Sequence, residues 1–439
     1  MNFDDAVAAL DARSNYERTG RLTSPSLDRM HDLMDLMAHP EASFPAIQVT
    51  GTNGKTTCAR AATEVLRAAG LGVATYVSPH VESIRERFLF DGAPIDSDDF
   101  VEAWRELAPF LDVVDGKHEQ PVTWFEAATA LAFTYFADRA VDVAVVEVGM
   151  GGSWDATNVV DGQVAAITRV AIDHPELGAT PAEIAREKAG IIKPGAIACL
   201  AEQDAEVAAI FRARCDEMQA EMRAEGIAFA VESGAVAVGG RALAVRLGKD
   251  RYDGLFLPMH GAQFAHDAVL GAAAARAFLG DRHLSAGILG DALSNLAVEG
   301  RMEVMRRRPL VVLDGAHNPA AARALAHELP SSFSFERCRI VFSAMRDKDV
   351  RGMIEALAPV ATEFVMTRND SPRAAAPEDL VAMAAEFGKN ASIVANVDDA
   401  VSVAIERSED TDCVCVTGSL YTVGEARRKL AQPRRIDGN

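Results

Sequence analysis

The sequence lacks an excess of positive charge, and this absence limits the partners it can have. Lys and Arg number 44 against 64 Asp and Glu, which gives a formal net charge of −20 at pH 7. Nucleic acids and anionic membrane surfaces are bound by clustered Lys and Arg that displace counterions. We therefore expect no nucleic acid and no membrane as a partner, and any anionic substrate must be held by local positive charge.

Long apolar runs and paired cysteines are also missing. No apolar run approaches the ~20 residues that span a bilayer, and the first residues, MNFDDAVAAL, lack the basic and then apolar order of a signal peptide. The six cysteines are scattered without metal-ligand spacing, which is typical of reduced, buried thiols. These features predict a cytoplasmic protein.

What the sequence does contain is a repeated alternation of apolar runs and amphipathic stretches over 439 residues. Continuously apolar strands separated by helices indicate parallel sheets covered on both faces, and a chain of this length favours two domains. We predict a doubly wound α/β domain over residues 1–300 and a smaller α/β domain over 301–439. The segment 232–258 is expected to be a β-hairpin meander that closes the first domain.

The stretch from Ile47 to Thr57, IQVTGTNGKTT, has the order strand, glycine-containing turn, helix. Glycines let backbone N–H groups approach phosphate oxygens, the helix N-terminus favours anions, and Lys55 would neutralise phosphate charge. Val49 stands where the strict Walker pattern has glycine, so the fit is to the shorter G-x-x-G-K-T loop; simple helix capping is the alternative. ATP binding is predicted here, through Thr52, Asn53, Gly54, Lys55, Thr56 and Thr57.

Glu147 and His174 each follow an apolar strand, in VDVAVVEVG and AITRVAIDHPELG. The carboxyl ends of parallel strands form the ligand-binding edge of an α/β sheet. Glu147 is therefore expected to ligate Mg²⁺, and the alternative is a pair with a nearby cation. For His174, a structural hydrogen bond is the alternative to metal binding.

Lys188 lies on a predicted helix from Pro181 to Ala189 that opens with a capping box at Thr180–Glu183. Lys188 and Ile184 are four residues apart and therefore share the apolar face. A lysine on such a face is costly unless it is paired or chemically altered, although it can also extend its amine to solvent. Lys188 is therefore a candidate site residue.

Together these segments resemble the folylpolyglutamate synthase/dihydrofolate synthase family, within the Mur-type ligases. The resemblance covers residues 20–430 and rests on a set of segments in the family's order: GTNGKTT, YVSPH, WFEAATALAF, EVGMGGSWDATNV, IDHPELGATPAEIAREKAGIIKPG, LDGAHNP, SAMRDKD and VTGSLYTVGEAR. It implies a P-loop, Mur-ligase-like ATP-binding domain with a mostly parallel sheet, followed by a Rossmann-like glutamate-ligase domain.

The resemblance also implies roles for individual residues. Lys55, His174 and Lys188 would form the catalytic set, with Lys188 carried as a carbamate beside ATP and two Mg²⁺ ions. The implied metal ligands are Thr56, Ser78, Glu147 and His174. The implied nucleotide contacts of the second part of the chain are Asp267, Arg301, Asp314, His317 and Asn318. The implied pterin-binding residues are Thr123, Phe125, Glu126, Trp154, Asp155 and Ala156, of which Phe125 and Trp154 are equally well explained as core.

Several positions depart from the family pattern, among them Phe264, in the segment where the family usually has H-Q-x-x-N. Thr56 and Asp267 stand where the family usually has glycine and asparagine, and Glu299 stands where a proline is common. The exchange at Asp267 bears on nucleotide contact.

The function that the resemblance implies is ATP-dependent ligation of L-glutamate to dihydropteroate, to the γ-carboxyl of folate, or to both, through an acyl phosphate. Two alternatives stay open: a Mur-type or other acid–amino acid ligase with a different acceptor, and a nucleotide-binding relative that has lost turnover. We expect a monomer that uses small-molecule substrates and whose domains close on ATP.

Overall fold

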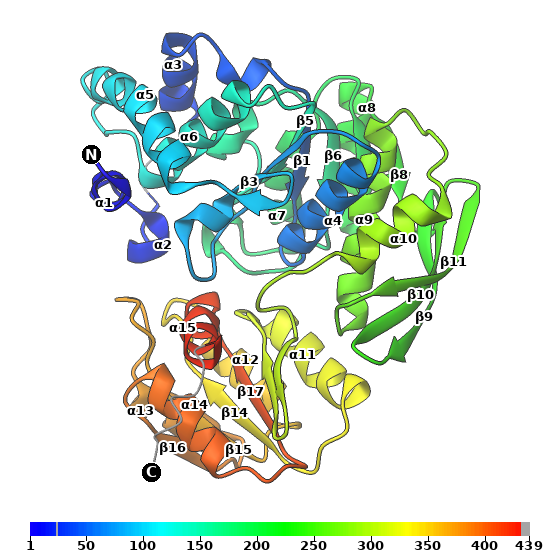
Figure 1. Cartoon of the computed structure of the whole chain (residues 1–439). Coiled ribbons are helices and arrows are strands. Elements are labelled where there is room, and N and C mark those ends of the chain that lie inside the picture. Colours follow the sequence, from blue (N-terminus) through cyan, green and yellow to red (C-terminus); the bar gives the residue numbers. More distant parts are fainter. Residues whose placement is uncertain (23–24, 432–439) are drawn as a thin grey trace. The chain divides into compact units, whose positions relative to one another are not determined.

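The computed structural model describes residues 1–22 and 25–431 and divides the chain into two compact units (Figure 1). The first unit contains residues 1–80, 84–258 and 263–297, and the second contains residues 81–83, 259–262 and 298–439. Each unit is built around its own mostly parallel sheet, so the predicted two-domain α/β class is confirmed.

The first unit has an eight-stranded sheet in the order β4-β3-β2-β5-β1-β6-β7-β8. The six strands from β2 to β8 in this order are each parallel to their neighbours. At the other edge, β3 is antiparallel to β2 and β4 is antiparallel to β3. The strand bounds in chain order are β1 (Ala46–Thr50), β2 (Val73–Tyr76), β3 (Phe88–Phe90), β4 (Ala93–Pro94), β5 (Val143–Glu147), β6 (Gly162–Ile167), β7 (Ile197–Leu200) and β8 (Glu221–Ala224).

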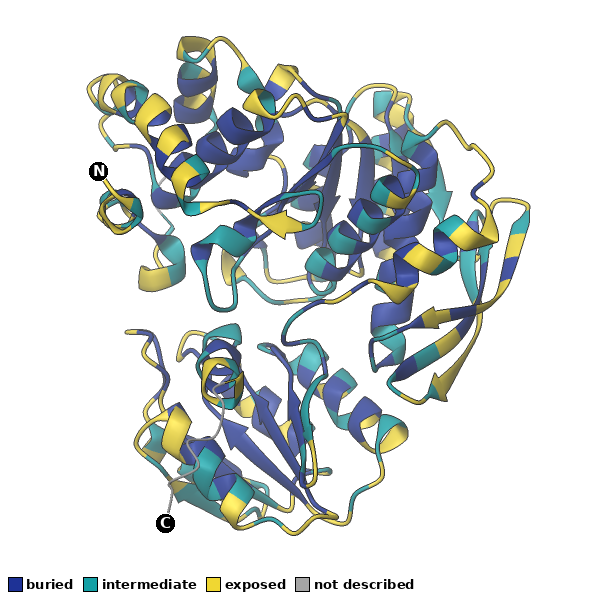
Figure 2. Cartoon of the chain, in the orientation of Figure 1, coloured by how far each residue is buried: buried dark blue, intermediate teal, exposed yellow. Residues whose placement is uncertain are grey.

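Helices cover this sheet, and its central strands are buried along their whole length (Figure 2). The predicted helix after the phosphate loop is confirmed as α4, and helix α6 precedes β5. The α-helices of the unit are α1 (Phe3–Asp11), α2 (Tyr16–Thr19), α3 (Asp28–Leu36), α4 (Lys55–Ala68), α5 (Ser97–Asp115), α6 (Trp124–Asp138), α7 (Pro181–Lys188), α8 (Ala205–Met218), α9 (Ala262–Phe278) and α10 (Ala286–Ser294). Short 3₁₀ helices are η1 (Pro40–Ala42), η2 (Ile84–Arg87), η3 (Ala156–Val159), η4 (Pro175–Leu177) and η5 (Ala189–Ile191).

The predicted meander is a separate three-stranded antiparallel sheet of β9 (Phe229–Ala237), β10 (Gly240–Leu247) and β11 (Asp250–Leu257). Its central strand β10 pairs with both neighbours along its length. The short turns between the strands carry Gly239 and Gly248 at positive φ, which the tight connections require.

The second unit has a six-stranded sheet in the order β12-β13-β17-β14-β15-β16, parallel except for β12 at one edge. Its strands are β12 (Glu303–Arg307), β13 (Leu310–Leu313), β14 (Cys338–Phe342), β15 (Glu363–Met366), β16 (Ala391–Ile393) and β17 (Cys413–Thr417). Its helices are α11 (Pro319–Ser332), α12 (Val350–Leu357), α13 (Pro377–Glu386), α14 (Val397–Glu406) and α15 (Leu420–Ala431).

The division of the chain differs from a single boundary at residue 300, because two short inner segments belong to the second unit. In segment 81–83, the carbonyl of Val81 lies so close to α15 that a Cβ at Gly424 would be 2.1 Å from it, and Glu82 pairs with Arg427. In segment 259–262, the ring of His260 lies 4.5 Å from that of Phe333. These contacts join residues far apart in sequence, which is why the pattern of apolar runs does not show them.

All six cysteines are buried and unbonded, as their spacing predicts. Among the described helices, none combines the length and the apolar character that crossing a bilayer requires.

Candidate active site

The phosphate loop joins β1 to α4. At two of its positions, the backbone conformation and close neighbours leave room only for glycine. Gly51 has φ +141° and Gly54 has φ +89°. A Cβ would lie 1.8 Å from Oγ1 of Thr168 at the first position and 2.2 Å from a carboxylate oxygen of Asp267 at the second. The N-cap residue of α4 is Gly54, which makes no side-chain capping hydrogen bond to the first N–H groups of the helix.

Lys55 folds back over this loop. Its Nζ donates to the carbonyl of Thr52 at 3.2 Å and, more weakly, to that of Gly51 at 3.4 Å. A carbonyl is a weaker partner for an ammonium group than a phosphate, so the lysine is placed to transfer to a bound phosphate.

The two threonines after Lys55 face different surroundings. Thr56 Oγ1 donates to both carboxylate oxygens of Glu147, at 3.1 and 3.0 Å. Thr57 is fully buried, and its hydroxyl has no hydrogen-bond partner among residues 1–22 and 25–431. Thr56 is therefore the threonine whose hydroxyl faces the carboxyl edge of the sheet.

Glu147 ends β5, between β2 and β1, and its side chain is 1% exposed. The backbone N–H of Ser78, two residues after β2, donates to it at 3.3 Å. The strand order thus brings together Thr56, Ser78 and Glu147, three of the four predicted metal ligands.

His174 and Lys188 meet Lys55 around a small hollow next to the phosphate loop. The hollow is lined by Gly51, Thr52, Lys55, Gly149, Met150, Gly151, Ala171, Asp173, His174, Leu177, Ile184 and Lys188. The three predicted catalytic residues therefore lie in one place, although they come from α4, the loop after β6 and α7.

Lys188 is a strongly perturbed titratable group of this hollow. It is 3% exposed, on the inward face that its spacing from Ile184 predicts. Burial, together with the positive charge of Lys55, lowers the pKa of the Lys188 amine to about 7, while Asp173 and Asp155 oppose this shift. At neutral pH a large share of this amine is therefore unprotonated and nucleophilic.

The predicted pterin-binding residues have structural partners in this unit. Thr123 and Glu126 form the capping box that opens α6, and Glu126 also accepts hydrogen bonds from the buried Arg29 at 2.8–3.2 Å. Asp155, whose pKa is raised by burial, accepts from the N–H of Met150 at 2.8 Å and of Thr157 at 3.0 Å.

Phe125 and Asp155 both contact residues that line the hollow. The ring of Phe125 lies against Gly149, where a Cβ would be 2.4 Å from Cζ, and Asp155 accepts from the N–H of Met150. Phe125 and Trp154 each pack in part on a core cluster, and Ala156, in η3, is buried. Of the predicted substrate residues, Phe125 and Asp155 are thus the two that lie beside the hollow.

The nucleotide residues predicted in the second unit are held by local contacts. Asp314 accepts from the N–H of Met302 at 3.0 Å and of Ala316 at 2.9 Å, and burial raises its pKa against the effect of Arg301. The carbonyl of Gly315 lies 2.9 Å from His317 Nδ1. Asn318 caps α11, accepting from the N–H of Ala321 at 2.9 Å.

Comparisons with known proteins identify the family of this chain and cover most of its length. A model of the Mur ligase middle domain matches residues 49–228, and a model of the Mur ligase glutamate ligase domain matches residues 300–420. A dihydrofolate synthase/folylpolyglutamate synthase of Mycobacterium tuberculosis is 40% identical over 435 residues, which cover 92% of this chain and 89% of that protein. The chain belongs to the dihydrofolate synthase/folylpolyglutamate synthase family. Members of this family are ATP-dependent ligases of the Mur type.

Other members of the family extend the likeness. The protein of the same name from Bacillus subtilis is 32% identical over 431 residues, 97% of this chain and 99% of that protein. The structure of Mycobacterium tuberculosis folylpolyglutamate synthase complexed with ADP has a TM-score of 0.93 at 38% identity, covering 98% of both chains. A folylpolyglutamate synthase complex with AMPPCP and folate has a TM-score of 0.86 at 28% identity, covering 98% of this chain and all of that one.

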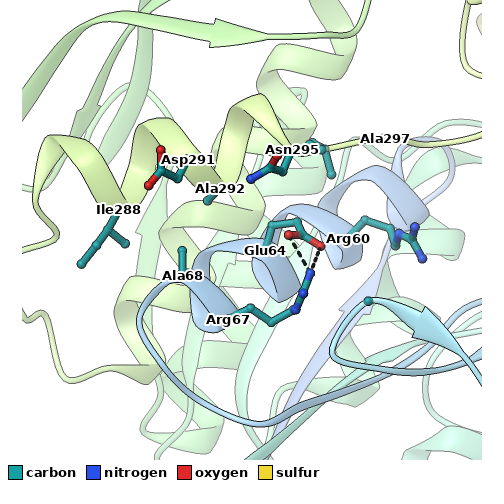
Figure 3. A pocket seen from close by; sticks show the side chains of 11 residues that line it. Arg60, Glu64, Arg67, Ala68, Ile288, Asp291, Ala292, Asn295 and Ala297 are labelled. Atoms are coloured by element: carbon teal, nitrogen blue, oxygen red, sulfur yellow. Dashed lines mark hydrogen bonds and ion pairs between the residues drawn. The ribbon is translucent and has the colours of Figure 1, made fainter.

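A second hollow in the first unit, of about 520 Å³, lies apart from these family residues (Figure 3). It lies where α4 and α10 are neighbours, and the pair Glu64–Arg67 forms one wall at 2.9 Å. None of the predicted ATP, metal or pterin residues lines it. The smaller hollow around Lys55 and Lys188 is therefore the better candidate, because it contains the perturbed lysine and adjoins the phosphate loop.

Two residues near His174 were not singled out by sequence reasoning. Tyr16, from α2, has its hydroxyl 3.3 Å from His174 Nδ1, and Asp173 lies 3.6 Å from His174 Nε2. Tyr16 carries no signal in its own segment, because 158 residues separate it from its partner.

Proposed function

We propose that this chain is an ATP-dependent ligase that forms an amide between L-glutamate and the carboxyl of dihydropteroate, the γ-carboxyl of folate, or both. The observation that carries the proposal is the meeting of Lys55, His174 and Lys188 around one hollow, next to the phosphate loop and the Thr56–Glu147 pair. The names of the relatives and the ADP, AMPPCP and folate complexes support it.

Mg²⁺ fits the donor set of this edge as a partner of bound ATP. Among the described residues, no group of three or more His, Cys, Asp or Glu is placed to hold a metal ion. Mg²⁺ usually takes one or two carboxylates and completes its shell with water and substrate phosphates. Glu147 with Thr56 meets that need, and Ser78 and His174 are the further candidates for two ions. When bound, Mg²⁺ would neutralise charge on the phosphates.

Carbamylation of Lys188 is the second part of the proposal. An unprotonated amine adds to CO₂ with formation of an N–C bond, and the nitrogen then loses a proton to give an anionic carbamate. The pKa of about 7 supplies the unprotonated amine at neutral pH. The product would replace a costly buried cation by an anion facing Lys55 and the metal site.

The proposed reaction needs no covalent enzyme intermediate. An oxygen of the acceptor carboxylate attacks the γ-phosphorus of ATP, and the bond to ADP breaks. The glutamate amine then attacks the acyl phosphate, inorganic phosphate leaves with the bonding electrons, and the amine nitrogen loses a proton to leave an amide. The chain's part is positioning and charge neutralisation by Lys55 and the N-terminus of α4. Arg301, Asp314, His317 and Asn318 stay candidates for nucleotide contact.

The decisive experiment offers dihydropteroate and tetrahydrofolate separately with ATP, Mg²⁺ and L-glutamate, and identifies the products by mass spectrometry. We expect a product one glutamate heavier from at least one acceptor, with phosphate released only when all three substrates are present. Turnover of a different acid would move the assignment to another acid–amino acid ligase.

Asp267 motivates the remaining alternative, a relative that has lost turnover. Its carboxylate lies against Gly54, where it competes with phosphate for the N-terminus of α4. We therefore expect Asp267→Asn to raise ATP affinity about 3- to 10-fold, measured by calorimetry. ATP binding without any amide product, in the native chain and in this variant, would support loss of turnover.

We also propose a cytoplasmic monomer. The six unbonded, buried cysteines support a reducing compartment. Light scattering at micromolar concentration measures the mass in solution, and a value near twice 46.8 kDa would contradict the monomer.

A further inference from the structure

The second hollow of the first unit follows the groove between α4 and α10 (Figure 3). Its volume is about 520 Å³, and most of its lining residues recur at the three- and four-residue spacing that places side chains on one face of a helix. Helix α4 contributes Arg60, Glu64, Arg67 and Ala68, and α10 with its C-cap contributes Ile288, Asp291, Ala292 and Asn295. The groove is therefore lined by charged and apolar side chains together.

The charges of Glu64 and Arg67 are already paired with each other. Nη1 of Arg67 donates to both carboxylate oxygens of Glu64, at 2.9 and 3.0 Å. The pair lies against Gly92 in the turn between β3 and β4, where φ is +78° and a Cβ would be 2.7 Å from Nη1 of Arg67. Glu64 is thus held on Arg67 and makes no ion pair with Arg60, although a spacing of four residues would allow one.

The side chains of Arg60, Asp291 and Asn295 have no hydrogen-bond or ion-pair partner among residues 1–22 and 25–431. Arg60 is half-buried, and the other two are exposed. Figure 3 shows Arg60 and Asp291 on opposite sides of the Glu64–Arg67 pair, with Asn295 between Asp291 and the pair. The hollow therefore offers a cation toward one end, an anion toward the other, and an amide that both donates and accepts between them.

We propose that this hollow binds a short peptide along the groove, with its terminal carboxylate on Arg60, its terminal ammonium group on Asp291 and one of its peptide groups on the amide of Asn295. The fork of a guanidinium group matches the two oxygens of a carboxylate, and an amide side chain can donate to and accept from a peptide group at once. Ile288 and Ala292 supply an apolar surface for a side chain of the peptide.

The distribution of charge favours a peptide over simpler ligands. An anion alone would be repelled by Asp291, and a cation alone would be repelled by Arg60. A free amino acid has both charges but carries them on one carbon atom, whereas Arg60 and Asp291 lie on opposite sides of the Glu64–Arg67 pair. An extended peptide gains about 3.3 to 3.6 Å per residue, so its two charged ends are separated along the groove.

The test is a titration of the full chain with the tripeptide alanyl-leucyl-alanine, followed by NMR of labelled isoleucine methyl groups. Ile288 lines this hollow and Ile184 lines the hollow around Lys188, so the two signals, assigned from Ile288→Val and Ile184→Val, separate the two sites. We expect the Ile288 signal to shift, half-maximally at a concentration on the order of 1 mM because exposed ion pairs contribute little, and the Ile184 signal to stay in place.

Charge-removing variants identify which end of the peptide each residue holds. Arg60→Gln should weaken binding of the tripeptide about 5- to 10-fold but leave binding of its C-terminal amide unchanged. Asp291→Asn should likewise weaken the tripeptide but not its N-acetyl form. Arg212→Gln and Asp216→Asn, at exposed positions of α8, are the matched controls and should bind the tripeptide as the native chain does.

Three outcomes would overturn the proposal: an Ile288 signal that does not move, a shift that is the same in Arg60→Gln and Asp291→Asn as in the native chain, or tighter binding of free L-leucine than of the tripeptide. The proposal is independent of the proposed function, because the titration needs neither nucleotide nor acceptor. A failed product assay would therefore leave the peptide site intact, and a failed titration would leave the ligase assignment intact.

Discussion

At the carboxyl ends of their central strands, the two units hold polar side chains by different means. In the first unit, Glu147 meets Thr56 across 91 residues, and His174 meets Tyr16 across 158. In the second unit, Asp314 bonds to Ala316 two residues away, and Asn318 bonds to Ala321 three residues away. The contacts of Glu147 and His174 need the whole sheet, whereas these contacts of Asp314 and Asn318 are made within one turn and one helix start. Elsewhere at this edge of the second unit, Asn369 donates to Thr422 across 53 residues.

The first unit also contains an energetically unfavourable burial of an ionisable amine. It buries Lys188 close enough to Lys55 for the two positive charges to repel each other. Strongly perturbed groups in a hollow are typical of reactive sites.

Removing the buried amine gives the largest expected effect. Lys188→Ala should lower kcat on the order of 10³-fold, because it removes the proposed anion from the metal site. Glutamate addition is measured by mass spectrometry, with thermal melting as a check on folding. The control is Lys117→Ala, a half-exposed lysine, which should keep full activity. A loss below tenfold for Lys188→Ala would assign it a structural role only.

The same lysine predicts a pH dependence of stability. Burial lowers its pKa from 10.5 to about 7 in the folded chain. Between these values the unfolded chain binds more protons, so the free energy of unfolding rises with pH in this window. In CO₂-free buffer the native chain should gain about 1.4 kcal/mol per pH unit relative to Lys188→Met from pH 7 to 9. Urea unfolding of both proteins measures this, and a difference that does not change with pH would contradict it.

A substitution in the phosphate loop tests whether the close packing of its glycines is needed for ATP binding. Gly51→Ala places a Cβ 1.8 Å from Thr168 Oγ1 and should weaken ATP binding about 10- to 100-fold. Gly70 also has a positive φ, of +92°, but nothing lies within 4 Å of its Cβ, so Gly70→Ala controls for a positive-φ substitution without a clash. Calorimetry should find native ATP affinity in Gly70→Ala. Equal affinities of the two variants would show that the clash does not matter.

The smallest expected effect is on the free energy of unfolding, and the substitution that causes it tests the local contacts of the second unit. Asn318→Ala removes the cap of α11 and should cost about 1 kcal/mol of unfolding free energy. Ser285→Ala removes the cap of α10 in the first unit and should cost a similar amount. If Asn318 also contacts nucleotide, only Asn318→Ala will lower ATP affinity in calorimetry. Unchanged affinity in both variants would restrict Asn318 to capping.

Sequence reasoning was most successful where the signal is local. The capping box at Thr180 and the spacing of Ile184 and Lys188 predict helix α7 and its buried lysine, and the structure has both. The α-helix ends at Lys188, one residue before the predicted end, and the chain continues as η5 (Ala189–Ile191). The inner segments 81–83 and 259–262 were not predicted, because their contacts are made by side chains and backbone far along the chain.

The sequence by itself determined the α/β class, the glycine-lysine loop at the start of α4 and the polar residues at the strand ends, because each follows from apolar periodicity, turn chemistry and helix capping. Only the tertiary structure decided that Thr56 faces Glu147 while Thr57 is buried, that Asp267 lies against Gly54, and that Tyr16 reaches His174. Those arrangements depend on strand order and helix packing, which bring distant residues together and leave no mark in the spacing of neighbouring ones.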